Sequence, residues 1–313
     1  MKPDLSVVIP AHNEIEAIPS LFAAIEKFVA AIDFLIQFVF VDDGSTDGTY
    51  EELCAKSIHK AEVKIIKLSK NFGAHAAIRA GIYHADADYT VIYSMDMPEP
   101  IEDIARFYAE LLSGTEIVYS KRLGYRGSLG SRIFARLVYR LIMPSYPTEG
   151  LIGVAFGPKA KAQLNQNMEA NTSLYFQIFQ LGFSTNSFDV IYQERETGVS
   201  SWTFTKKLKL MIDCFVTFSF LPIRAISTIG VIMAALGFIW AIVIVIIKVF
   251  GLFELSAGWP TLLSVILIGF GITNLSLGII SEYLVRIMQS ARNTPVFIVD
   301  RITEHPSGIN LPQ

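Results

Sequence analysis

Cysteine and charge are both scarce in this chain of 313 residues, and each scarcity excludes a class of protein. Two cysteines, Cys54 and Cys214, are too few for a disulfide framework and are typical of a reducing compartment, although one distant disulfide stays open. Charged residues make up 18% against 52% hydrophobic residues, which excludes a disordered chain. The net charge of -3 argues against a nucleic-acid partner, because proteins of that class present a basic surface.

Two long stretches near the C-terminus lack charge altogether. Residues 225–247 and 255–281 contain no Asp, Glu, Lys or Arg. Each stretch is long enough to cross about 30 Å of hydrocarbon as a helix. We therefore predict two transmembrane helices, at about 223–249 and 259–285, in preference to two buried helices of a soluble core.

Basic residues are distributed unequally around these two predicted helices. They flank the side that carries both chain termini: Lys206, Lys207, Lys209, Arg224, Arg286 and Arg292. The connection between the helices offers only Lys248 and Glu254. The positive-inside rule therefore predicts a multi-pass protein of the inner (plasma) membrane with both termini in the cytoplasm. The start of the chain lacks the pattern of a signal peptide.

Predicted strands and helices alternate over the first part of the chain. Apolar, β-branched runs predict strands at 5–10, 35–41, 63–68 and 89–93, and helical spacing predicts helices at 15–31, 50–58 and 74–85. This alternation indicates an α/β fold with a mostly parallel sheet. Ligands of such sheets bind beyond the carboxyl ends of the strands, where polar clusters stand at residues 11–14, 42–47 and Asp96.

Two adjacent aspartates, Asp42 and Asp43, end the second predicted strand. Carboxylates at this place repel a bare phosphate, but they accept hydrogen bonds from a nucleobase or ribose, or bind a divalent cation that carries phosphates. A turn followed by a helix N-cap explains Ser45 or Asp47 equally well. We favour a ligand role for the aspartate pair, because capping does not account for two carboxylates at the end of a buried strand.

Several motifs along nearly the whole chain match one family. They occupy residues 6–14 (Ser-Val-Val-Ile-Pro-Ala-His-Asn-Glu), 41–49 (Val-Asp-Asp-Gly-Ser-Thr-Asp-Gly-Thr), 68–73, 76–81, 194–200 and 282–287. In these motifs the chain resembles the family 2 inverting glycosyltransferases with the GT-A fold. The paired C-terminal spans resemble the membrane-anchored polyprenyl-phosphate glycosyltransferase branch, to which dolichyl-phosphate mannose synthase and the bactoprenol glucosyl transferases belong. The strand-like run 295–299 resembles the family's ending.

The resemblance implies both a reaction and a domain organisation. A sugar would pass from a nucleotide-diphosphate sugar to a polyprenyl (undecaprenyl-type) phosphate, giving a lipid-linked monosaccharide for the cell envelope or a polysaccharide. The implied parts are a GT-A catalytic domain, an amphipathic juxtamembrane helix, a pair of transmembrane helices and a cytoplasmic tail, at 1–202, 203–222, 223–288 and 289–313.

The resemblance also carries roles over to single residues. The nucleotide-binding residues that it implies are Pro10, Ala11, Glu14, Asp42, Asp43, Ser45, Met95 and Asp96. The catalytic residues that it implies are Asp96, Arg122, Arg132 and Arg195, of which the three arginines would face the donor pyrophosphate or the acceptor phosphate. Asp96 alone would be the metal ligand.

The predicted metal site departs from the family's pattern. Where the family has Asp-Ala-Asp-Leu-Gln, Ser94 replaces the first aspartate and Pro98 replaces the glutamine. Proline offers neither a side-chain oxygen nor an N–H. The family's Gly-Asp-Phe-Arg run is also missing near residue 150, and a lysine expected after Arg195 is Ser201. We therefore expect Mg²⁺ or Mn²⁺ to bind weakly and only together with the donor.

Two further features concern the membrane. Arg132, Arg136 and Arg140 recur at four-residue spacing within 131–146, which predicts an amphipathic helix either at the membrane surface or packed on the domain. Small residues in the predicted spans, such as Gly230 and Ala234, permit a homo-oligomer.

Two other functions stay open at this point. A processive membrane polysaccharide synthase uses the same domain, but its Gln-x-x-Arg-Trp acceptor motif does not occur in the chain. A catalytically weakened relative could serve as a binding or assembly partner, and the substitutions at Ser94 and Pro98 motivate that alternative.

Overall fold

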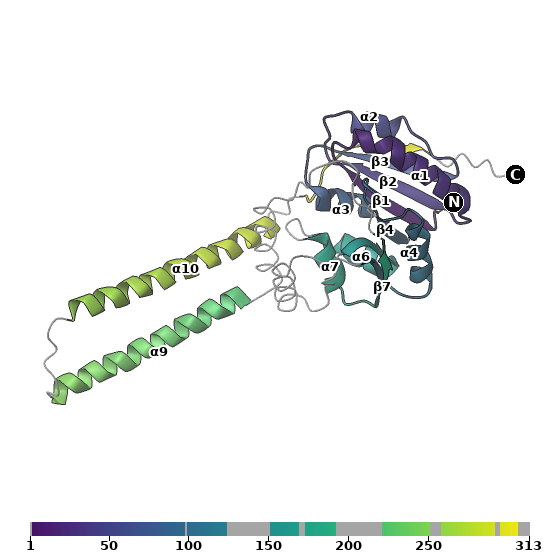
Figure 1. The fold of residues 1–313 in the computed structure, drawn as a ribbon. Coiled ribbons are helices and arrows are strands. Elements are labelled where there is room, and N and C mark those ends of the chain that lie inside the picture. Colours follow the sequence, from purple (N-terminus) through teal and green to yellow (C-terminus); the bar gives the residue numbers. More distant parts are fainter. Residues whose placement is uncertain are drawn as a thin grey trace. The chain divides into compact units, whose positions relative to one another are not determined.

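The computed structural model describes residues 2–97, 99–123, 151–168, 173–191, 221–250, 258–291 and 295–305. The chain divides into two compact units (Figure 1). One unit combines Met1–Leu210 with Pro295–Gln313, and the other consists of Met211–Thr294. The C-terminal segment therefore belongs to the same unit as the N-terminus.

The first unit contains an eight-stranded sheet in the order β7-β5-β6-β4-β1-β2-β3-β8. Its strands are β1 (Leu5–Ala11), β2 (Ile36–Asp42), β3 (Ala61–Leu68), β4 (Tyr89–Ile92), β5 (Ile117–Arg122), β6 (Leu151–Phe156), β7 (Thr185–Val190) and β8 (Val299–His305). β1 runs parallel to β2 and β4, β2 to β3, and β5 to β7. Only β6 and β8 run antiparallel to their neighbours, so the sheet is mostly parallel, as predicted.

Helices cover both faces of this sheet (Figure 1). One face carries the short helix η1 (Ile15–Ala17), α1 (Ile18–Ala31), α2 (Thr49–Cys54) and α4 (Asp103–Leu112), and the other carries α3 (Ala74–His84), α6 (Pro158–Gln166) and α7 (Leu174–Gln180). Because both faces are buried, Val7, Val8 and Ile9 are all fully buried at successive positions. Gly81 allows α3 to approach β1, since a Cβ there would lie 2.3 Å from Val8 Cγ1.

The four strands predicted for the first part of the chain are all confirmed, whereas two boundaries were wrong. The helix predicted at 50–58 ends at Cys54. The C-terminal strand begins at Val299 and ends at His305, instead of spanning 295–299. Pairing with β3 decides this position, because the Ser69 amide donates to the Ile298 carbonyl (2.9 Å) immediately before β8 begins.

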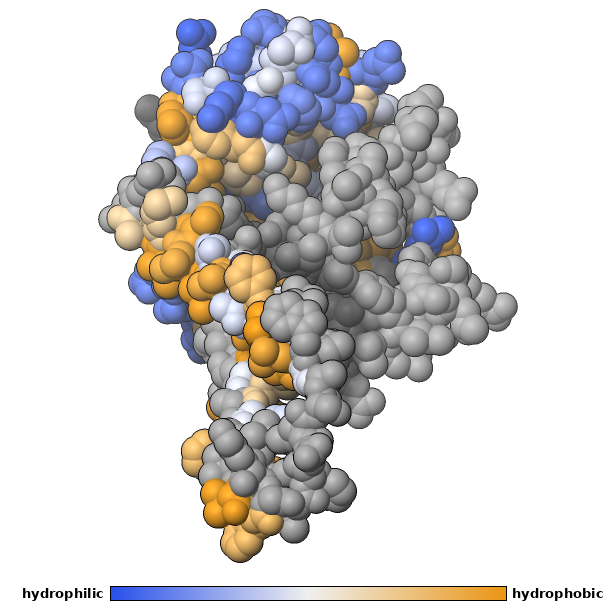
Figure 2. Space-filling model, turned by 90° about the vertical axis from the view of Figure 1, so that its left-hand side faces the viewer, coloured by the Kyte–Doolittle hydropathy of each residue, from blue (hydrophilic) through white to orange (hydrophobic). Residues whose placement is uncertain are grey.

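The second unit consists of two long helices that lie side by side (Figure 1). They are α9 (Leu221–Phe250) and α10 (Trp259–Ala291), and they confirm the predicted positions of two apolar helices. Among the described residues, one stretch, Ile268–Val285, is long and apolar enough to cross a membrane, so the second predicted span is not confirmed. Large apolar side chains such as Phe238 and Phe270 are mostly exposed (70% and 67%), and those residues of the helix pair that are coloured in Figure 2 are mainly orange to white.

Two predicted surface helices lie almost wholly outside the described residues. These are the amphipathic helix at 131–146 and the juxtamembrane helix at 203–222, of which only the last two residues belong to α9. Arg132 and Arg195 lie outside the described residues as well.

Candidate functional site

The carboxyl ends of β1 and β2 lie next to each other at one edge of the sheet. Ala11 stands opposite Asp42 in the parallel register, and the Asp43 amide donates to the Ala11 carbonyl at 2.9 Å. The sheet therefore brings together predicted nucleotide-binding residues from both strands. Pro10 keeps part of its surface exposed, whereas Ala11 is buried and offers mainly its backbone.

Hydrogen bonds join the loop after β1 to the loop after β2. The Asn13 amide donates to Ser45 Oγ (2.9 Å), and the Glu14 amide donates to Thr49 Oγ1 (3.0 Å). Asn13 has a positive φ of 54°, which Asn tolerates better than most residues. Asp47 accepts from Ile15 N (3.2 Å) and Thr49 N (3.0 Å) and so joins the two loops. The N-cap position of α2 is Gly48, so neither Ser45 nor Asp47 is the N-cap that the alternative explanation predicted.

The two adjacent aspartates have different surroundings. Asp43 accepts two short backbone hydrogen bonds, from Phe72 N to Oδ1 (2.7 Å) and from Gly73 N to Oδ2 (2.8 Å). Asp42, which is fully buried, accepts long bonds from Ser45 N at 3.3 and 3.4 Å; burial raises its pKa, and hydrogen bonds with the side chain and backbone of Ser45 act against that shift. Both oxygens of Asp43 thus hold the loop after β3, whereas the contacts of Asp42 are with Ser45 in its own loop.

The loop after β3, residues 69–73, packs tightly against the loop after β2. A Cβ on Gly44, whose φ is +66°, would lie 2.6 Å from the Lys70 carbonyl carbon, so only glycine fits there. His12 Nδ1 lies 2.9 Å from the Asp43 carbonyl oxygen, which only accepts, so this nitrogen carries the proton. His12 Nε2 then accepts from the Asn71 side-chain amide at 2.9 Å. Sequence reasoning identified the 68–73 motif without a role for it.

Asp96 lies in a turn that follows β4, at the same edge of the sheet. The Met97 amide donates to the Ser94 carbonyl at 3.2 Å, and Ser94 Oγ donates to Asp96 Oδ1 at 2.5 Å. Met95 between them is buried in the core, so its side chain is not available to a nucleotide. Within the described part of the chain, no group of three or more His, Cys, Asp or Glu side chains could hold a metal ion. One carboxylate and one hydroxyl fit a hard cation only where substrate oxygens complete the site.

Glu99 connects this turn to β5 and β6. Its Oε2 accepts from Ser120 Oγ (2.6 Å), and Ser120 Oγ accepts in turn from the Gly153 amide (2.8 Å). A Cβ on Gly153 would lie 2.1 Å from Glu99 Oε1, so the carboxyl group fills the space that this glycine leaves. Burial raises the pKa of Glu99 to about 7, and only 2% of the residue is exposed. Glu99 is therefore a link between the turn and the strands β5 and β6, a role that the sequence analysis did not predict.

Arg122 ends β5 at the same edge of the sheet. The amide of the next residue, Leu123, donates to the Val190 carbonyl of β7 at 2.9 Å. β6 separates β5 from β4 in the sheet, which corresponds to about 10 Å between the strands that end near Arg122 and Asp96.

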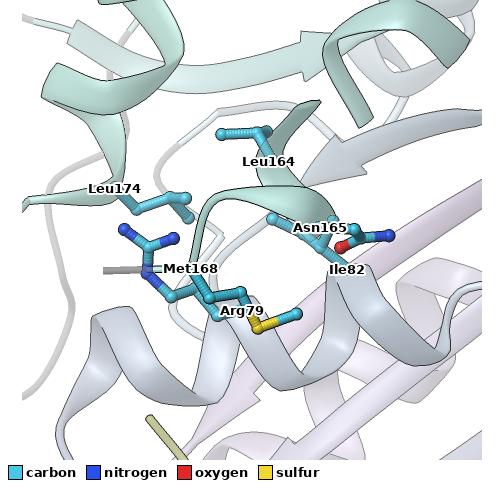
Figure 3. A pocket seen from close by; sticks show the side chains of 6 residues that line it. All are labelled: Arg79, Ile82, Leu164, Asn165, Met168 and Leu174. Carbon is cyan, nitrogen blue, oxygen red and sulfur yellow. The ribbon is translucent and has the colours of Figure 1, made fainter. Parts of the chain in front are cut away.

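A small pocket lies between α3, α6 and α7 (Figure 3). Its lining consists of Arg79, Ile82, Leu164, Asn165, Met168 and Leu174. Arg79 is 2% exposed, and one turn earlier burial lowers the pKa of His75 to about 4, with the Arg79 charge contributing. None of the predicted site residues lines this pocket, and its mostly apolar lining indicates helix packing.

Comparison with known proteins connects this geometry to a family. The family model described as Glycosyl transferase family 2 matches residues 6–170. A relative named undecaprenyl-phosphate 4-deoxy-4-formamido-L-arabinose transferase, from Pseudomonas paraeruginosa, is 30% identical and covers 95% of this chain and 90% of its own. Another, from Bacillus subtilis, is the glycosyltransferase YkcC, at 29% identity over 95% of this chain and 93% of its own.

Among solved structures, glucosyl-3-phosphoglycerate synthase from Mycobacterium tuberculosis, in complex with Mn²⁺, UDP and glucosyl-3-phosphoglycerate, is similar at a TM-score of 0.48. It is 18% identical, and the likeness covers 68% of this chain and 80% of that one. The family model spans more than half of the chain and includes β1, β2, β4 and β5, which carry the candidate site. The chain belongs to glycosyl transferase family 2.

Proposed function

We propose that this glycosyltransferase moves a sugar from a nucleotide-diphosphate sugar to a polyprenyl phosphate at the cytoplasmic face of the membrane. One observation carries the proposal: Asp42 at the end of β2, Asp96 in the turn after β4 and Arg122 at the end of β5 lie at one edge of the sheet. The apolar helices α9 and α10 stand between β7 and β8 of the same sheet in the chain. The relatives named as undecaprenyl-phosphate transferases support it, because they match the helix pair as well as the sheet.

The two substrates would use different parts of this edge. Asp42 would accept a hydrogen bond from the base or ribose beside Pro10, Ala11 and Glu14. Arg122, together with Arg132 and Arg195 outside the described residues, would offset the charge of the leaving diphosphate and bind the acceptor phosphate, since arginine makes bidentate phosphate contacts.

The acceptor needs little activation. A phosphate monoester has a second pKa of about 6 and is already anionic near neutral pH. The site therefore has to supply positioning and positive charge, and no general base is required for this nucleophile. The proposed site meets this requirement, because it offers the carboxylates of Asp42 and Asp96 as acceptors and Arg122 as a cation. The aspartate that the chain lacks near residue 150 is then less important, since no general base is needed.

A divalent cation would bind through Asp96, with Ser94 as a neutral neighbour. The ion would neutralise charge on the donor diphosphate when bound. Mg²⁺ often uses one or two carboxylates and completes its shell with substrate phosphates and water. Glu99 is engaged with Ser120 and does not add a second carboxylate. The protein's own contribution is to hold Asp96 in place through the turn that begins at Ser94.

The pairing of β8 with β3 supports the predicted topology. β8 follows α10 in sequence, yet it pairs with a strand that precedes α9. If α9 and α10 each cross the membrane, both ends of the pair must emerge on the side of the sheet. The basic residues around 206–224 and 286–292 place that side in the cytoplasm. The predicted domain boundaries, after residues 202, 222 and 288, stay a prediction. The pairing of β8 with β3 adds that residues of the predicted tail form part of the sheet.

The experiment that tests the function uses membranes that contain the full chain. They are incubated with undecaprenyl phosphate and a panel of labelled UDP- and GDP-sugars, and the extracted lipid is analysed. We expect one donor to yield a labelled lipid-linked monosaccharide, and Asp96→Asn to abolish the signal. A labelled polymer, or no labelled lipid with any donor, would contradict the proposal.

A second candidate function is a binding or assembly partner with weakened catalysis. The hydrogen bond from Ser94 to Asp96 favours it, because it occupies one oxygen of the carboxylate that would hold the metal. Nucleotide binding without sugar transfer in the same assay would support this alternative.

A further inference from the structure

Residues 69–73 form the loop between β3 and α3. The loop that follows β2, which belongs to the proposed donor site, holds it on one side. Asp43 accepts from the amides of Phe72 and Gly73, and Gly44 lies against the backbone of Lys70 and Asn71. The position of this loop therefore bears on the side chain of Asp43, whereas its neighbour Asp42 is fixed by strand pairing within β2. A loop that moved away would leave both oxygens of Asp43 without their backbone donors.

The same loop is held on its other side by the C-terminal segment. The Ser69 amide donates to the Ile298 carbonyl at 2.9 Å, at the point where β8 begins. The side chains of Phe72, Phe297 and Val299 pack against the same hydrophobic cluster. The segment before β8 thus holds the backbone of the loop at its first residue, while Phe297 packs against Tyr83 and His84 at the far end of α3.

β8 itself is fastened to the sheet along its length. It pairs antiparallel with β3 from Leu68↔Val299 to Val63↔His305, with an irregularity between Lys67 and Leu68. Tyr50 and Thr303 hydroxyls lie 3.0 Å apart, and Lys64 Nζ lies 3.2 Å from Glu304 Oε1. Lys64 is nearly buried, so its contact with Glu304 is better shielded from water than an ordinary surface ion pair. β8 is therefore an integral strand, and without it β3 would be the edge of the sheet.

We infer that β8 and the Ile298 carbonyl are a positioning element of the donor site, which keeps the 69–73 loop against Asp43. The inference rests on the proposed function for its link to a nucleotide sugar, but the mechanical link between β8 and the loop is independent of any substrate. It assigns to the segment after the helix pair a role in donor binding as well as in closing the sheet.

The test weakens β8 in the full chain and follows the amides of the loop. In an edge strand, successive N–H groups point alternately to the neighbouring strand and to solvent, so one of any two adjacent amides of β8 faces β3. The double variant Ile302→Pro with Thr303→Pro therefore removes one hydrogen bond between β8 and β3. The matched control is Asn186→Pro with Ser187→Pro in β7, the strand at the opposite edge of the same sheet. Hydrogen exchange is measured for the peptide that contains Phe72 and Gly73, and for β1 as a report on the intact core.

We expect the β8 variant to raise exchange at Phe72 and Gly73 by about tenfold, which corresponds to about 1.4 kcal/mol. The β7 control and the β1 amides should keep wild-type exchange. Titration with UDP and with GDP should show a parallel loss of affinity in the β8 variant for the nucleotide that binds. Wild-type protection of the loop in the β8 variant, or equal loosening of the loop in both variants, overturns the inference.

A gentler variant covers the case in which the prolines loosen the whole sheet. Thr303→Val with Glu304→Gln removes the Tyr50 contact and the Lys64 ion pair and leaves the backbone of β8 intact. We expect faster exchange at Phe72 and Gly73 than in wild type, with β1 unchanged, and wild-type exchange at these amides overturns the inference. Loop exchange that follows β8 while neither UDP nor GDP binds would leave the positioning role standing and contradict the proposed function instead.

Discussion

Replacing each of the adjacent aspartates by alanine should separate a structural role from a binding role. Asp43→Ala leaves the Phe72 and Gly73 amides without their partner, in a place where the aspartate is 3% exposed. An unsatisfied buried donor costs about 1–3 kcal/mol, so the two together cost about 2–6 kcal/mol of folding free energy. Asp42→Ala loses the contacts with Ser45, including the long ones to its amide at 3.3 and 3.4 Å, but it also removes a buried carboxylate, so it should cost about 1 kcal/mol or less.

The direct effects of the two substitutions on donor affinity should have the opposite order to their effects on folding free energy. Asp42→Ala removes the acceptor proposed for the base or ribose, which should weaken donor binding by about 1–3 kcal/mol, or about 5- to 150-fold. Asp43→Ala should lower the apparent melting temperature by about 4–12 °C, at about 2 °C per kcal/mol for a domain of this size. Any loss of donor affinity in Asp43→Ala should come from the loosened 69–73 loop, and it should become smaller at lower temperature.

The assays are thermal unfolding by intrinsic fluorescence and calorimetric titration with the donor that the lipid assay identifies. Asp33→Ala is the matched control, because this aspartate is exposed and lies in the loop before β2. Unchanged donor affinity in Asp42→Ala would refute the assignment of the nucleotide acceptor. Wild-type stability in Asp43→Ala would refute the structural role that the two short hydrogen bonds indicate.

Three other predictions concern the metal, the topology and the pH dependence. Calorimetry should detect little Mn²⁺ binding without the donor, and Ser94→Asp should tighten it because a second carboxylate is added; tight binding to the donor-free wild type would contradict the ligand count. With Cys54 and Cys214 replaced by serine, a cysteine introduced by Ser307→Cys should react with an impermeant maleimide only after the cells are opened, and labelling of intact cells would refute the cytoplasmic tail. Burial raises the pKa of Glu99 from its ordinary value of 4.5 to about 7, so the folded state binds this proton more tightly than the unfolded state. The unfolding free energy of the wild type should therefore fall by up to about 3 kcal/mol between pH 4.5 and 7. Glu99→Gln should remove this loss. If the unfolding free energy depends on pH equally in both proteins, the prediction is wrong.

Local pattern was sufficient for much of the fold. Apolar β-branched runs located the strands that became β1 to β4, because a strand buried on both faces reads as a continuous apolar run. The alternation of strands and helices was enough to predict a mostly parallel sheet and to place Asp42 and Asp96 at its ligand-binding edge. Uncharged length alone located α9 and α10, since few other environments tolerate so long a run without charge.

Tertiary structure decided what depends on contacts between distant parts of the chain. Asp42 and Asp43 are identical in type and adjacent, and only the amides of Phe72 and Gly73 distinguish them. Glu99 is enclosed by Ser120 and Gly153, from two other strands, and no local pattern in the sequence predicts that contact. The C-terminal strand lay beyond its predicted position because pairing with β3, more than 200 residues earlier in the chain, sets where it begins. A pattern of side chains along the sequence records which face of an element is buried, but it does not record which distant backbone group will meet a given carboxylate or strand edge.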